Sequence, residues 1–215
     1  MSLQTVIEVA RGELGVTENP PGSNRVKYWD EYDRTWQGQP WCVCFLWWCF
    51  QHAGEGMAFF GGGKTASCGT LLRWYSAQGQ TVAKKDIKPG DIVILNFSGT
   101  AETQHCGLVV DTLKMGYIQT IEGNTSQSGS QSNGGQVCLK TRNLSHVVGV
   151  CRPKYKEEEP VMADDLTEHW AESSCRKARA KAIMKGYPDG DFKPDKELTR
   201  AELAVILDRL GLLDD

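Results

Sequence analysis

The sequence lacks an excess of basic residues. Its 215 residues include 24 Lys and Arg against 27 Asp and Glu, which gives a formal net charge of −3. A protein that binds nucleic acid needs positive charge to neutralise the phosphates. The charge balance therefore argues against a nucleic-acid partner.

The sequence also lacks a long apolar run. No stretch reaches the roughly 18 apolar residues that a membrane-spanning helix needs, so we expect no membrane span. The start, MSLQTVIEVARGELG, has neither a basic segment nor a long apolar one, and so does not resemble a signal peptide. We therefore expect synthesis in the cytoplasm without a signal peptide, and another route of release if the protein acts outside the cell.

Paired metal-binding cysteines are missing as well. The chain has eight cysteines, but no two of them form a C-x-x-C pair, which argues against a zinc site. Without an export signal, disulfides are not expected either. We expect reduced thiols, most of them small core residues, and we expect no metal and no cofactor.

The predicted elements change in type along the chain. Residues 4–14 have apolar side chains at helical spacing, and residues 41–54 form an apolar stretch long enough for a buried helix. After residue 90, β-branched stretches separated by turn residues predict strands at residues 92–97, 106–112, 116–123, 137–142 and 146–153. These strands follow one another too closely for helical crossovers, so they predict an antiparallel sheet in an α+β fold.

A charged segment sets the C-terminal part of the chain apart. Residues 154–162 begin with KYKEEEP and form the predicted linker. Helical patterns return at residues 170–184 and 200–210, where Thr199 and Glu202 form a predicted capping box. We therefore predict a domain at residues 1–153, the linker, and a small all-α module at residues 163–215.

Cys42 is the candidate nucleophile. A thiol needs a lowered pKa to attack, and the partial positive charge at the first turn of a helix lowers it. Cys42 lies where Pro40 leads into the apolar helix. Cys44 is about 200° round the helix, and Cys49 lies about two turns deeper. On helix position alone, the alternative that all three are core thiols stays open.

His105 is the candidate general base. It precedes a predicted strand and follows a turn-rich loop, a place where functional side chains often lie. If the next strand pairs antiparallel with this one, Glu122 and Asn124 come near the imidazole and can orient it. His146, at the start of the last strand, is the main rival base. His52 is far from the start of the cysteine helix.

Six segments in order resemble the CHAP domain, a family of cysteine, histidine-dependent amidohydrolases or peptidases. They are ELGVTENPPGSNRVKYW, GQPWCVCFLWWCFQHAG, KPGDIVIL, HCGLVV, IEGNTS and VVGVCRP, within about residues 1–153. The resemblance implies a papain-like fold, in which N-terminal helices pack on an antiparallel sheet. It implies Cys42 as nucleophile and His105 as base, with Glu122 and Asn124 as further polar members. No counterpart of the acidic calcium loop of some members is visible, so it implies no required metal.

Three later segments resemble one S-layer homology (SLH) motif. They are HWA at residues 169–171, GYPDGDFKP at residues 186–194 and LTRAELA at residues 198–204. The resemblance implies two helices joined by a loop that bind a secondary cell-wall polymer, with Trp170, Arg200 and Glu202 as candidate site residues. Packing and helix capping are the alternative roles of Trp170 and Glu202. SLH motifs usually come in threes, so we expect this single, small module to form a homo-oligomer such as a trimer, or to dock on the catalytic domain.

Together the resemblances imply a phage or prophage endolysin, or an autolysin, that cuts an amide bond of bacterial peptidoglycan. An N-acetylmuramoyl-L-alanine amidase is favoured over a stem or cross-bridge endopeptidase. The missing signal peptide favours release through a holin pore, with action at the bacterial cell wall. The alternatives are a non-catalytic wall-binding protein, which the intact catalytic set argues against, and a protease acting on proteins, which the wall-binding module argues against.

Overall fold

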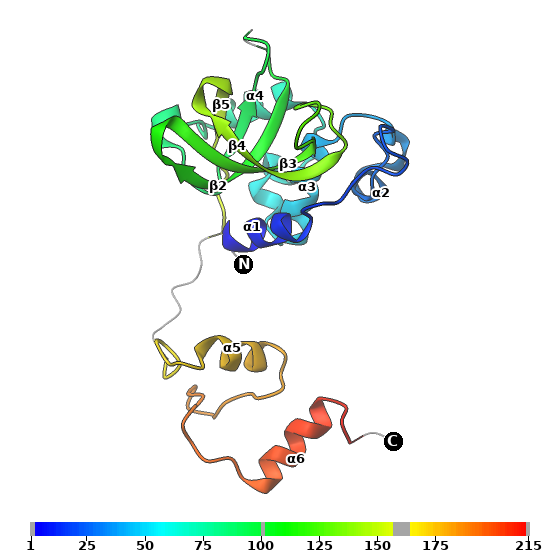
Figure 1. Ribbon diagram of the computed structural model, residues 1–215. Coiled ribbons are helices and arrows are strands. Elements are labelled where there is room, and N and C mark those ends of the chain that lie inside the picture. The colour runs from blue at the N-terminus through cyan, green and yellow to red at the C-terminus, as the bar shows by residue number, and fades with distance from the viewer. Residues whose placement is uncertain (1–2, 100–101, 157–163, 214–215) are drawn as a thin grey trace. The chain divides into compact units, whose positions relative to one another are not determined.

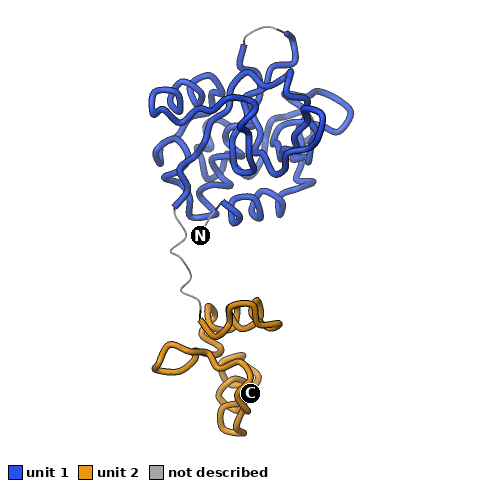
Figure 2. Tube along the Cα trace, turned by 90° about the vertical axis from the view of Figure 1, so that its left-hand side faces the viewer, with its two compact units in different colours: residues 1–157 blue, residues 158–215 orange. Residues whose placement is uncertain are grey.

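The computed structural model describes residues 3–99, 102–156 and 164–213. The chain forms two compact units, residues 1–157 and 158–215 (Figure 2). None of the described helices has the length and apolar content that a membrane crossing requires.

The first unit extends past the predicted boundary at residue 153. Tyr155 donates a hydrogen bond from its hydroxyl to Gly90 O at 2.6 Å, and Lys156 N donates to Glu55 Oε2 at 3.1 Å. These contacts place the first residues of the predicted linker within the first unit. Residues 157–162 of that linker lie outside the described residues.

The first unit has helices followed by strands (Figure 1), which is the predicted α+β class. Helices α1 to α4 are Leu3–Gly12, Lys27–Tyr32, Cys42–His52 and Cys68–Ala77. Strands β1 to β5 are Ile92–Leu95, His105–Leu113, Tyr117–Thr125, Gln136–Asn143 and Val147–Cys151. Short 3-10 helices η1 to η6 lie at Arg34–Trp36, Gly56–Ala58, Phe60–Gly62, Lys84–Asp86, Lys114–Gly116 and Leu144–His146.

The five strands form one sheet in the order β4-β3-β2-β1-β5, and all neighbouring strands are antiparallel, as predicted. Strand β1, which lies between β2 and β5, has no polar alternation because both of its faces are covered. Ile92 and Ile94 belong to the larger core cluster, whereas Val93 and Leu95 belong to a smaller cluster on the other face. A strand buried on both faces is expected to be apolar throughout.

Helix α3 positions the candidate nucleophile against the sheet. It is buried at every residue from Cys42 to Phe50, so it has no polar face, and it contacts both β2 and β3. Close packing depends on Gly123 of β3, where a Cβ atom would lie 2.6 Å from Cβ of Phe45 and 2.8 Å from Cζ3 of Trp41. The missing side chain therefore lets the first turn of α3 approach the middle of the sheet.

The second unit contains α5 (Glu172–Ala180) and α6 (Arg200–Arg209), close to the predicted helices. The capping box is confirmed, because Thr199 Oγ1 accepts from Glu202 N at 3.1 Å and Glu202 Oε2 accepts from Thr199 N at 2.8 Å. Among the described residues of this unit, only Leu166 and Phe192 are buried apolar side chains. Most of the apolar surface of α6 is therefore open.

Candidate active site

Cys42 is the first residue of α3, in the turn where backbone N–H groups have no acceptor within the helix. The residue is 5% exposed, so it lies just below the surface. Hydrogen bonds from Cys106 and Cys68, together with the neighbouring His105, outweigh burial and hold the pKa of the Cys42 thiol well below its ordinary value. The site therefore favours a thiolate at this position.

The other two cysteines of α3 have the opposite property. Burial raises the pKa of Cys44 and of Cys49 above the ordinary value for a thiol. Both side chains are fully buried. This difference supports Cys42 as the reactive thiol of the helix.

His105 is fully buried at the start of β2, where it pairs with Leu95 of β1. Its Nε2 lies 3.0 Å from Glu122 Oε2, while Nδ1 has no hydrogen-bond partner among the described residues. Burial opposes the charged imidazole, but the neighbouring Cys42 thiol and Glu122 carboxylate prevail and raise the pKa of His105 to about 9. The imidazole thus lies between the thiol and the carboxylate, with Nδ1 left to exchange the proton.

Glu122 is fully buried in β3 and is held by three side chains. Thr120 donates from Oγ1 to Oε1 at 2.5 Å, and Arg142 of β4 donates from Nε to Oε1 at 2.8 Å and from Nη2 to Oε2. Burial disfavours the carboxylate, but the hydrogen bonds from Arg142 and His105 lower the pKa of Glu122 to about 2. The carboxylate is therefore charged and oriented when it meets the imidazole.

Gly107 makes room for this carboxylate. A Cβ atom on Gly107 would lie 2.7 Å from Cγ of Glu122 and 3.2 Å from Cβ of Thr120. Any larger residue would displace the Glu122 side chain from its position beside the imidazole. The sequence HCGLVV thus supplies both the base and the space for its partner.

Asn124, which the sequence places with Glu122, has its side chain in a different environment. Its Nδ2 donates to Asn133 Oδ1 at 3.0 Å, and its Oδ1 accepts from Gly135 N at 3.3 Å. Its backbone has φ of +56°, within an irregular stretch of the β3–β4 pairing between Glu122 and Thr125. The structure therefore places Asn124 as an anchor of the loop before β4.

The sequence did not identify Arg142, Thr120 or Cys68 as site residues. Cys68 carried the same signal as Cys42, since it begins a helix, α4, whose N-cap Ser67 accepts from Thr70 N at 3.2 Å. Arg142 carried a weaker signal, as a charged residue near the end of a predicted strand. Its side chain is 6% exposed and fully engaged in the site.

The rival histidines have other partners. His52 is paired with Glu31 at 2.8 Å and stacks on Trp48. His146 packs edge-on against Phe97. His105, by contrast, is among the groups that lower the pKa of Cys42, which supports it as the base.

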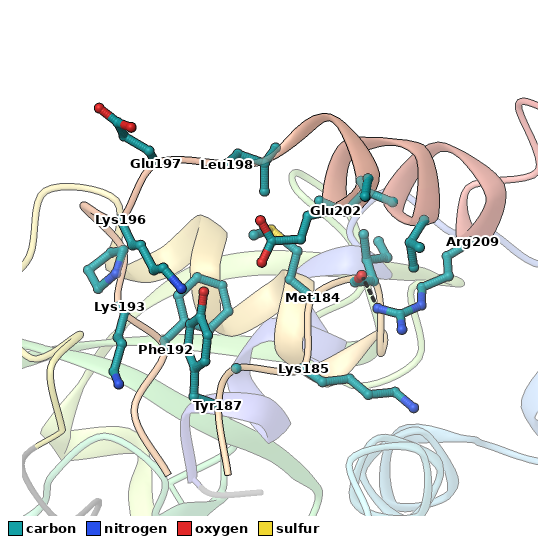
Figure 3. Close-up of a pocket in the computed structure, with 16 residues that line it drawn as sticks. Met184, Lys185, Tyr187, Phe192, Lys193, Lys196, Glu197, Leu198, Glu202 and Arg209 are labelled. Atoms are coloured by element: carbon teal, nitrogen blue, oxygen red, sulfur yellow. Dashed lines mark hydrogen bonds between the residues drawn. The ribbon is translucent and has the colours of Figure 1, made fainter. Parts of the chain in front are cut away.

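The second unit has a groove of about 630 Å³ that runs along α6 from Ala201 to Arg209. Figure 3 shows Tyr187, Lys196 and Glu202 around it, and the ammonium groups of Lys193 and Lys196 lie 4.8 and 4.4 Å from the centre of the Tyr187 ring. Of the three predicted site residues, Glu202 lines this groove. Trp170 is 90% exposed and Arg200 is also exposed, but neither lines the groove.

Two protein families match the chain. The CHAP domain matches residues 34–124, and the S-layer homology domain matches residues 164–204. Both resemblances drawn from the sequence are confirmed.

Relatives match short segments. A segment of 44 residues is 49% identical to cell surface glycoprotein 1 of Acetivibrio thermocellus, covering 20% of this chain and 2% of that protein. Another of about 50 residues is 40% identical to a cellulosome-anchoring protein of the same organism, covering 21% of this chain and 11% of that protein. The chain therefore spans only a small part of these relatives.

Two solved structures are similar in part. The endolysin LysIME-EF1 is 19% identical with a TM-score of 0.44, over 73% of this chain and 66% of that one. Ly7917 is 16% identical with a TM-score of 0.41, over 71% of this chain and 63% of that one. In each case the chain spans slightly less than two thirds of the other protein. On the family matches, the chain combines a CHAP domain at residues 34–124 with an S-layer homology domain at residues 164–204.

Proposed function

We propose that the chain hydrolyses an amide bond of bacterial peptidoglycan, with Cys42 as nucleophile and His105 as general base. The CHAP domain supports peptidoglycan hydrolysis. The observation that carries the mechanism is the buried series of Cys42, His105 and Glu122, in which the thiol has a lowered pKa and the imidazole a raised one. Such opposed shifts are expected where a thiolate and an imidazolium form an ion pair.

The reaction would be acyl transfer. The Cys42 thiolate attacks the amide carbon, and the backbone N–H of Cys42 at the start of α3 is one donor to the oxyanion. Imidazolium Nδ1 of His105 then protonates the leaving amine, which leaves a thioester. Water deprotonated by the same nitrogen hydrolyses the thioester and restores the thiolate. Glu122 holds the ring in place throughout through Nε2.

The test is digestion of purified peptidoglycan by the wild type and by Cys42→Ala. Cys44→Ala is the matched control, because it removes another buried thiol from the same helix. We expect loss of about a thousandfold or more with Cys42→Ala, as for removal of a catalytic nucleophile, and a much smaller loss with the control. Full activity of Cys42→Ala would remove Cys42 from the mechanism.

The same digest identifies the bond. An N-acetylmuramoyl-L-alanine amidase, which we favour, releases peptides with a new N-terminal alanine and leaves the lactyl group of muramic acid free. An endopeptidase instead creates new termini within the stem or cross-bridge. Mass spectrometry of the fragments separates the two. The absence of any cleavage would favour a non-catalytic wall-binding protein.

We also propose that the second unit holds the enzyme on a secondary cell-wall polymer, and that release through a holin pore gives access to the wall. The SLH match supports wall binding, and the matching relatives are described as a cell surface glycoprotein and a cellulosome-anchoring protein. Trp170, Arg200 and Glu202 remain the proposed binding residues. Open apolar side chains on α6, including Leu203 and Val205, are compatible with the proposed trimer.

Wall binding is tested by cosedimentation of catalytically inactive Cys42→Ala chains with cell walls. Adding Trp170→Ala should weaken binding by about tenfold, as expected for loss of an aromatic contact of 1–2 kcal/mol. Trp36→Ala is the matched control, because Trp36 is a partly exposed tryptophan of the first unit. Light scattering in solution tests the trimer, which a monomer at all concentrations would contradict.

A further inference from the structure

Three thiols from separate elements meet at the candidate active site. Cys42 begins α3, Cys68 begins α4 and Cys106 is the second residue of β2. Their Sγ atoms all lie within 4.8 Å of one another, and the Cys42 and Cys68 sulfurs are 3.8 Å apart. All three residues are buried, with exposed fractions of 5%, 7% and 0%.

This spacing matches a metal site better than a chance grouping of core thiols. Thiolates bound to Zn²⁺ at about 2.3 Å in tetrahedral geometry lie roughly 3.8 Å from one another. One edge of the triangle already has this length, and the other two are no longer than 4.8 Å. Among the described residues, this is the only group of three or more His, Cys, Asp and Glu side chains close enough to share an ion.

Helix N-termini place partial positive charge beside two of the three sulfurs. Two of the three thiols lie in the first turns of helices α3 and α4, of 11 and 10 residues, where unpaired N–H groups concentrate partial positive charge. A fourth ligand position is left for water.

We propose that Cys42, Cys68 and Cys106 together bind one thiophilic d¹⁰ cation such as Zn²⁺, and that the occupied site is hydrolytically inactive. Binding forms three sulfur–metal bonds, and the protons of the thiols, including the one that Cys42 shares with His105, leave to the solvent. The lone pair of the nucleophile is then held by the metal and cannot attack an amide. The inhibition of hydrolysis by the cation rests on the proposed function, whereas binding of the cation does not depend on it.

The absence of a C-x-x-C pair in the sequence does not exclude this site. Such pairs mark sites built within one turn of chain, whereas these ligands are 26 and 38 residues apart along the sequence, at residues 42, 68 and 106. Only the packing of α3 and α4 against β2 brings them together. A single sequence gives no direct signal for a site of this kind.

The test uses the full reduced chain, freed of metal with a chelator. Titration with Cd²⁺ should give thiolate-to-metal charge-transfer absorption that saturates at one ion per chain, and competition with a chromophoric chelator gives the affinity for Zn²⁺. Cys68→Ser and Cys106→Ala should each lower that affinity by more than about 100-fold, beyond the loss typical of an outer-shell partner. Cys44→Ser, a buried thiol outside the group, should bind as the wild type does.

Hydrolysis of peptidoglycan is then compared with and without Zn²⁺ for each protein. Wild type and Cys44→Ser should lose activity at one equivalent and regain it with chelator, while the inhibiting concentration should rise with Cys68→Ser. Equal Zn²⁺ affinity in wild type, Cys68→Ser and Cys106→Ala would overturn the site. Saturable binding by a chain that is inactive even after chelation would contradict the proposed function and leave the metal site standing.

Discussion

The buried charges of the site should cancel, so that removing any one of them destabilises the others. A Cys42 thiolate and the Glu122 carboxylate are each negative, and the His105 imidazolium and the Arg142 guanidinium are each positive, so they sum to zero. Arg142 and Glu122 are 6% and 0% exposed at the side chain. Removing Arg142 leaves one uncompensated negative charge in a site with little water, and breaking a buried pair in this way costs about 3–5 kcal/mol.

Arg142→Met is the suitable perturbation. The guanidinium lies 4.8 Å above the ring of Phe97, and methionine keeps the length and an apolar contact with that ring while it removes the charge. We expect the free energy of unfolding to fall by about 3 kcal/mol, the lower end of that range. Because the extra negative charge also opposes the thiolate, the pKa of Cys42 should rise, and alkylation by iodoacetamide in mildly acid solution should slow.

The decisive comparison is the double variant Glu122→Gln with Arg142→Met. It removes one charge of each sign, so the site is neutral again. Interacting residues in such a network show coupling energies of about 0.5–3 kcal/mol, and we expect the double variant to be more stable than the sum of the single changes predicts by more than 1 kcal/mol. Urea unfolding of the four proteins at neutral pH measures this.

A double variant that only adds the two single effects, within about 0.5 kcal/mol, would refute this cancellation of charges. Faster or unchanged alkylation of Cys42 in Arg142→Met would refute its link to the nucleophile. Lys140→Met is the matched control. Lys140 lies on the same strand and donates to the backbone oxygen of Ser126 at 2.6 Å, and so should leave alkylation unchanged.

Three further predictions concern pH and packing. With chelator present, hydrolysis should fall above pH 9 as His105, whose pKa is about 9, loses the proton that the leaving amine needs. The pKa of Glu122 is lowered from 4.5 to about 2, so the carboxylate should stabilise the fold fully at pH values above 4.5. This stabilisation should be lost as the pH falls towards 2. The contribution amounts to about 3 kcal/mol, and the stability of Glu122→Gln, measured by acid unfolding, should not show this dependence on pH. Gly123→Ala should lower the free energy of unfolding by about 1–3 kcal/mol, because the new Cβ would meet Phe45. Gly12→Ala is the control, since the space around Gly12 is open, and thermal unfolding should place it within about 1 kcal/mol of the wild type.

The parts of the fold that could be predicted are those with local signals. The apolar stretch at residues 41–54 predicted a buried helix with Cys42 at its start, and the structure has α3 at Cys42–His52. Likewise, the capping box at Thr199 could be predicted from the sequence, because all of its atoms belong to four consecutive residues. Signals of this kind depend on periodicity and caps, which a single sequence contains.

The partners of the catalytic residues could not be predicted because they depend on strand register and side-chain reach. Cys138 of β4 lies opposite Glu122, and Arg142 is four residues further along the same strand. Its long side chain reaches back along β4 to the carboxylate. Neither the register nor that reach follows from the pattern VCLKTR.

The environment of Asn124 could not be predicted because of a local irregularity in β3. Residues two apart on a strand point to the same face, so a regular β3 would place Asn124 beside Glu122, facing the histidine strand. At Asn124 the backbone instead has φ of +56°, and the β3–β4 register shifts between Glu122 and Thr125. Asparagine adopts this conformation more readily than most residues. Asparagine is thus suited to this turn, and the catalytic role of Asn124 stays a prediction.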